Sequence, residues 1–135
     1  MFNSNLIVIE KKMTMNLFKK GSQNQKMTNN DKIPELTNGE FDDFIKEGAV
    51  LIDFFAEWCM PCMMMSPILD DLSEKFKGKI KFGKVNVGEG GQEIAQKYNV
   101  SSIPNFTLFK DGKVAEQFIG SMTEDDFEEK LKSCL

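Results

Sequence analysis

The sequence contains no histidine and no arginine, and it has only three cysteines. Without histidine, a histidine-based catalytic triad is excluded, so any catalytic group must be Cys, Asp, Glu, Lys or Tyr. Structural zinc is disfavoured because it needs about four ligands, which are mostly Cys and His, so we expect no metal. Three cysteines in 135 residues are also too few for a disulfide scaffold. These absences leave cysteine as the main candidate for chemistry.

A strong positive charge is missing as well. The net charge is −4, and every basic residue is lysine, so nucleic-acid binding is disfavoured. The charge is unevenly divided, because residues 1–30 carry +4 and the remaining residues carry −8. The basic segment is rich in Asn, Ser, Gln and Lys, and we expect residues 1–30 to be a disordered extension. Residues 31–135 are expected to form one domain.

Long apolar runs are absent too. The longest run in the basic segment, residues 6–9, is shorter than the ~7–15 apolar residues of a secretory signal. No run approaches the ~20 apolar residues that a membrane span needs. The sequence therefore predicts a cytoplasmic protein in a reducing compartment, with no membrane association.

Residues 33–135 show alternating strand and helix patterns. The expected elements are a short strand at 33–36, a helix that opens at a capping box over 37–40 and ends at Gly48, a buried strand at 49–56, a long helix from about 61 to 76, a strand at 79–87, a short helix around 94–98, hairpin strands at 105–109 and 114–119, and a helix from 121 or 123 to 135. The order βαβαβαββα predicts an α/β fold with a central mixed sheet flanked by helices.

The pentapeptide Trp58-Cys59-Met60-Pro61-Cys62 lies where the buried strand at 49–56 gives way to the long helix. The free N–H groups and the positive dipole end of a helix N-terminus favour an anion, here a cysteine thiolate. Two cysteines three residues apart share one helix face, so a disulfide between them can form and open with little backbone movement. The motif therefore predicts a reversible dithiol.

Three further positions break their local patterns. Asp53 lies in an otherwise apolar strand, where a buried carboxylate is costly and its pKa should rise; the alternative is an exposed acid on a half-buried strand. Lys84 interrupts the apolar alternation of its strand, either beside Asp53 or as a solvated charge. Pro104 follows Ile103 at the start of a strand, where a cis peptide is occasionally found.

Residues 33–135 resemble the thioredoxin family, of the WCxPC type. The segments LIDFFAEWCMPC at 51–62, GKVNV at 83–87, SIPNF at 102–106 and KDGKV at 110–114, together with Pro67 and Gly120, occur in the order and spacing of that family. A lone CxxC would be weak evidence, but this combination is specific. The resemblance implies a thioredoxin-like fold and a protein-disulfide reductase without a cofactor. It also implies disulfide-containing client proteins, a thioredoxin reductase as electron donor, and a monomer.

The resemblance also assigns roles to individual residues. Cys59, whose pKa the helix N-terminus should lower, would attack the client disulfide, and Cys62 would resolve the mixed disulfide. Asp53 would act as general base for Cys62, with Lys84 close to it. The expected substrate-binding residues are Trp58, Met60, Pro61, Ile103, Pro104 as a cis-proline, and Gly120.

Two departures from the family leave alternatives open. Met60 replaces the usual Gly between Cys and Pro, and Asn105 replaces the common Thr after the proline, so the redox potential is not fixed and a disulfide oxidase or isomerase is an alternative. The Cys and Met cluster at 59–65 offers soft ligands for a copper(I) carrier, although consecutive helical residues point in different directions. A non-catalytic scaffold is the third alternative. Cys134 is either a buried or frayed-end thiol or a regulatory one.

Overall fold

The computed structural model describes residues 33–135, so the disordered extension expected at residues 1–30 lies outside the described residues. The elements are α3 (Asn38–Ile45), β2 (Ala49–Phe55), α4 (Met60–Lys75), β3 (Lys81–Asn86), α5 (Gln92–Lys97), β4 (Asn105–Lys110), β5 (Lys113–Ile119) and α6 (Glu124–Ser133). Each corresponds to an element expected from the sequence. Within this part of the chain, no helix is both long enough and apolar enough to cross a bilayer.

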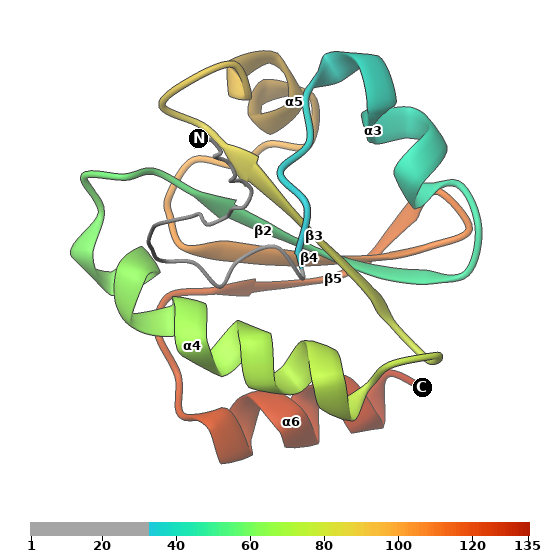
Figure 1. Cartoon of the computed structure of the whole chain (residues 1–135). Coiled ribbons are helices and arrows are strands. Elements are labelled where there is room, and N and C mark those ends of the chain that lie inside the picture. Colours follow the sequence, from blue (N-terminus) through green and yellow to red (C-terminus); the bar gives the residue numbers. More distant parts are fainter. Residues whose placement is uncertain (1–32) are drawn as a thin grey trace, which may run out of the picture. The chain divides into compact units, whose positions relative to one another are not determined.

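The four strands form one mixed sheet with the order β3-β2-β4-β5. β2 pairs with β3 in parallel, whereas the β2–β4 and β4–β5 pairs are antiparallel. Helices α4 and α6 cover one face of this sheet, and α3 and α5 lie on the other (Figure 1). The expected α/β fold with a central mixed sheet flanked by helices is therefore confirmed, and the hairpin β4–β5 ends with β5 at one edge of the sheet.

The strand expected at 33–36 is reduced to a single bridge, in which Glu35 pairs in parallel with Lys84 of β3. The Leu36 N–H donates to the Lys84 carbonyl at 2.7 Å, and the Lys84 N–H donates to the Pro34 carbonyl at 2.9 Å. Pro34 has no N–H of its own, so the ladder cannot continue through it as a regular strand. The next residues already belong to the cap of α3, where Glu40 accepts the Thr37 N–H at 2.6 Å.

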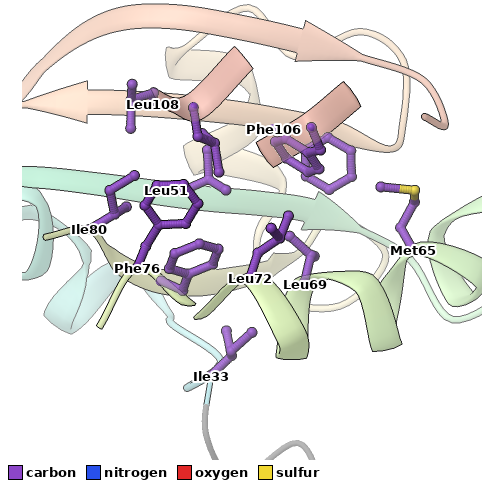
Figure 2. Close-up of a cluster of buried hydrophobic side chains, with 12 residues drawn as sticks. Ile33, Leu51, Met65, Leu69, Leu72, Phe76, Ile80, Phe106 and Leu108 are labelled. Carbon is purple, nitrogen blue, oxygen red and sulfur yellow. The ribbon is translucent and has the colours of Figure 1, made fainter. Parts of the chain in front are cut away.

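Both faces of β2 are buried, which explains its nearly continuous apolar sequence. Leu51 packs against the helices α4 and α6, whereas its neighbours Val50 and Ile52 pack on the α3 and α5 side. Figure 2 shows the first of these layers, with the α4 side chains Met65, Leu69 and Leu72 facing the sheet residues Leu51, Phe106 and Leu108. This packing fixes α4 against the sheet, so the first turn of α4 has a defined place at the carboxyl end of β2.

Candidate active site

The dithiol motif lies at the first turn of α4. Cys59 is the N-cap residue and has extended backbone geometry, while Cys62 is in the first helical turn. The two side chains are joined as a disulfide with a Cα–Cα distance of 5.3 Å. The backbone N–H of Cys62 donates to the sulfur of Cys59 at 3.3 Å. The pair expected from the sequence is therefore within bonding range, and the sulfur of Cys59 occupies the position of an N-cap acceptor.

The local sequence explains this placement. After the apolar strand β2 the chain turns, and the Cys59 N–H donates to the Ala56 carbonyl at 3.2 Å. Pro61 falls in the first turn of α4, where its missing N–H leaves no hydrogen bond unmade. The first turn carries no acidic residue. The positive end of the helix dipole and the Cys62 N–H can therefore stabilise negative charge on the Cys59 sulfur when the disulfide is open.

The two cysteines belong to an apolar cluster that has exposed neighbours in the sequence. Cys59 and Cys62 are 6% and 2% exposed, so Cys59 is slightly the more accessible of the two. Both pack with Phe55 and Ala56, and Ile103 packs against the same cluster. Trp58 and Met60, on either side of Cys59 in the sequence, are exposed. Both cysteines are therefore largely covered, and the small exposed part of Cys59 lies next to the exposed residues Trp58 and Met60.

Asp53 is buried, and the alternative of an exposed acid is wrong. It lies on the same face of β2 as Leu51, which packs against α4, and Phe55, which packs against the cysteines. Its Oδ1 atom is buried and has no hydrogen-bond partner within residues 33–135. Burial raises the pKa of Asp53 from 3.8 to about 7, and the charge of Lys84 opposes this rise. The carboxyl can therefore gain or lose a proton near neutral pH.

Lys84 is the direct neighbour of Asp53, because the two residues are paired in the parallel β2–β3 register. It is half-buried, and its ammonium group lies 5.0 Å from the centre of the Phe55 ring. The structure therefore favours a lysine held beside Asp53 over a fully solvated strand charge. Its positive charge stabilises the ionised form of the carboxylate.

The remaining expected residues meet at the amino end of β4. The Ile103–Pro104 peptide bond is cis, in agreement with the sequence-based expectation. The Gly120 N–H donates to the Pro104 carbonyl at 2.9 Å, so the two residues are adjacent. Gly120 has a φ of +96°, which favours glycine, and a Cβ there would meet no atom within 4 Å. Ile103, which directly precedes Pro104, packs against the cysteine cluster.

Comparison with known proteins agrees with this geometry. The family model Thioredoxin matches residues 32–133. The chain belongs to the thioredoxin family. Its relatives include proteins named Thioredoxin from Chlamydia pneumoniae, 45% identical over 63% of this chain and 81% of the relative, and from Pseudomonas aeruginosa, 40% identical over 70% and 88%. A further one from Staphylococcus aureus is 36% identical over 73% of this chain and 94% of the relative.

Thioredoxin-family membership and the Cys59–Cys62 pair make this protein a thiol–disulfide oxidoreductase of the protein-disulfide reductase class. The family implies disulfide-containing client proteins and a reductase that reopens the oxidised pair. The copper(I) alternative is not favoured, since Met65 is buried in the core while Met60 and Met64 are exposed. The oxidase or isomerase alternative is not favoured either.

Two residues near the thioredoxin-family motif were not recognised from the sequence as part of the site. A Cβ at Gly88 would come within 3.3 Å of the Trp58 indole nitrogen, so this glycine leaves room for the exposed ring. The Gly88 N–H donates to the Asn86 side chain at 2.9 Å, which holds the loop after β3 in place. The second residue, Phe55, packs in the same buried cluster as the two cysteines. In the sequence, Gly88 indicates only a break, and Phe55 only one of several buried apolar residues.

Proposed function

We propose that this protein reduces disulfides of client proteins in the cytoplasm, acts as a monomer, and receives its electrons from a thioredoxin reductase. Cys59 is the attacking nucleophile and Cys62 the resolving thiol. The observation that carries the proposal is the position of Cys59 at the N-cap of α4, with the Cys62 N–H directed at its sulfur. This arrangement stabilises a thiolate, which is the form of cysteine that attacks disulfides.

The proposed reaction transfers two electrons from the dithiol to the client. The Cys59 thiolate attacks one sulfur of the client disulfide, and the other client sulfur leaves and takes up a proton. This step joins Cys59 to the client through a mixed disulfide. Cys62 then loses its proton and attacks the Cys59 sulfur, which releases the second client thiol and closes the Cys59–Cys62 bond. The reductase returns two electrons to the pair.

Asp53 is the proposed acceptor of the Cys62 proton. A general base works best when its pKa is close to the pH of the reaction, and burial raises the pKa of Asp53 to about 7. Its position on the strand face between Leu51 and Phe55 supports this role, because α4 and the cysteines pack on the same face. Lys84 would tune the proton affinity of Asp53 through its charge.

The client would bind over the residues that surround the dithiol. The proposed substrate-binding residues are Trp58, Met60, Pro61, Ile103, Pro104 and Gly120. The Ile103 backbone would pair with an extended client segment by strand addition, and Gly120 would let that segment approach closely. The hydrogen bond between Gly120 and Pro104 supports this assignment, because it holds Gly120 next to the residue that follows Ile103, and Ile103 packs against the cysteine cluster.

Reduction of insulin disulfides by single cysteine variants tests the proposal. We expect Cys59→Ser to abolish reduction and Cys62→Ser to accumulate a mixed disulfide with the client. Cys134→Ser is the matched control, because Cys134 is the C-cap of the last helix, α6, and is not part of the dithiol. Reduction by Cys59→Ser at the wild-type rate would overturn the proposal.

The direction of electron flow needs a second measurement. A redox titration of the purified protein against a standard dithiol gives the potential of the Cys59–Cys62 pair. A potential close to the family's reference value of about −270 mV supports a reductant. A potential of about −120 to −180 mV would instead assign the protein to disulfide oxidation or isomerisation.

A further inference from the structure

Helix α4 carries two apolar stripes. One of them contains Cys62, Met65, Leu69 and Leu72 and is buried against the rest of the fold. The other contains Met60, Met63, Met64 and Pro67, which are spaced i, i+3, i+4 and i+7 and therefore share one helix face. All four are exposed, and Met60 and Met64 are 69% and 68% exposed. We call this second stripe the methionine face.

The methionine face is continuous with the redox site. Met60 lies between the two cysteines in the sequence, and the exposed ring of Trp58 precedes Cys59. No charged residue occurs from Trp58 to Leu69, so the first half of α4 is an uncharged surface. A client whose disulfide reaches Cys59 must therefore lie close to this face.

An exposed helix face often marks a partner-binding surface when its apolar residues recur at the spacing typical of a buried face. Burial of its methionines against apolar groups is favourable, and the absence of charge means that no ion has to be desolvated. Methionine is unbranched and flexible, so the face can adapt to partners of different shape. Its selectivity should therefore depend on the apolar character of the partner and not on one particular contour.

We infer that the methionine face binds apolar side chains that border the disulfide of a client. The preferred substrates are then proteins whose disulfide lies beside exposed residues such as Leu, Val or Phe. This inference rests on the proposed function, because it concerns the clients of the same dithiol. It names the substrate class, which the catalytic cysteines alone leave open.

The test compares two disulfide-bonded peptides that differ only in the residues next to the disulfide, which are Leu and Phe in one and Ser and Gln in the other. The variant is Met63→Gln with Met64→Gln, because these residues lie outside the Cys59–Cys62 segment and Gln is about as good a helix former as Met. We expect its KM for the apolar peptide to rise about tenfold, or about 1.4 kcal/mol, with kcat unchanged. For the polar peptide, KM should change by less than about twofold.

Val114→Gln is the matched control, since Val114 is also an exposed apolar residue, 47% accessible, and lies at the opposite end of β5 from Ile119. It should change neither KM value. Raising the salt concentration should leave the preference for the apolar peptide intact, because apolar contacts are not screened. Equal KM values for both peptides in the wild type, or an equal change for both in the double variant, would overturn the inference while the proposed function stands. A wild-type protein that reduces neither peptide would overturn both.

Discussion

Replacing Asp53 by Asn should remove most of the pH dependence of stability between weakly acidic and weakly alkaline solution. In the folded protein, burial raises the pKa of Asp53 from 3.8 to about 7. Below about 3.8 the carboxyl is protonated in both the folded and the unfolded state, and the stability it contributes is fully present. Between the two pKa values only the folded state keeps the proton, so stability falls as the pH rises and the loss is complete above about 7.

The size of this effect follows from the two pKa values. At about 1.36 kcal/mol for each pH unit, the difference between 3.8 and about 7 corresponds to about 4 kcal/mol of unfolding free energy. About 3 kcal/mol of this should be lost between pH 5 and pH 8. Asn has nearly the same shape as Asp but does not titrate, so the Asp53→Asn variant should lose much less stability over that range.

Urea unfolding of the oxidised protein at several pH values measures this directly. The quantity to compare is the difference in unfolding free energy between Asp53→Asn and the wild type, which should grow by about 3 kcal/mol from pH 5 to pH 8. Asp71→Asn, at an exposed position of α4, is the matched control and should show no such growth. If the wild type and Asp53→Asn lose stability in parallel, the carboxyl does not titrate in the buried state and the reasoning fails.

Three further substitutions test the charge beside Asp53 and the packing at two glycines. Lys84→Gln removes the charge that lowers the pKa of Asp53, so the midpoint of the pH-dependent stability difference should move above about 7; an unchanged or lower midpoint would contradict this. Gly91→Ala should cost about 1–3 kcal/mol in urea unfolding, because its Cβ would lie 2.5 Å from a methyl group of Val85. Gly39→Ala in helix α3, where a Cβ would meet no atom within 4 Å, should instead add about 0.5–1 kcal/mol. Equal effects of the two alanines would show that the close packing at Gly91 does not matter.

Much of the fold could be predicted from the sequence because local patterns and tertiary packing agree. The run at 49–56 is apolar on both faces because both faces of β2 are covered, and Asp53 interrupts it visibly. The strand expected at 33–36 was reduced to a bridge, because Pro34 lacks the N–H that a regular ladder needs. The sequence pattern predicted that residues 33–36 are extended, but it did not show how many of them would pair with β3.

The candidate site could be located from the sequence but not completed. The cysteine motif, the cis Ile103–Pro104 bond and the buried Asp53 carry recognisable signals. The space that Gly88 leaves for Trp58 depends on two segments meeting in three dimensions, and no local pattern reports it. The spacing along α4 likewise contains two apolar stripes, and only packing decides which faces the sheet. Along this helix Met65 packs in the core, whereas Met60 and Met64 are exposed.

Electron transfer through the Cys59–Cys62 pair is best measured in a single turnover. The reduced protein is mixed with a disulfide-bonded client, the reaction is stopped with acid, and free thiols are alkylated and located by mass spectrometry. The expected result is one new Cys59–Cys62 disulfide for each client disulfide that is opened, preceded by a mixed disulfide that contains Cys59. Loss of client disulfides while both cysteines stay free, or a mixed disulfide formed through Cys134, would contradict the mechanism.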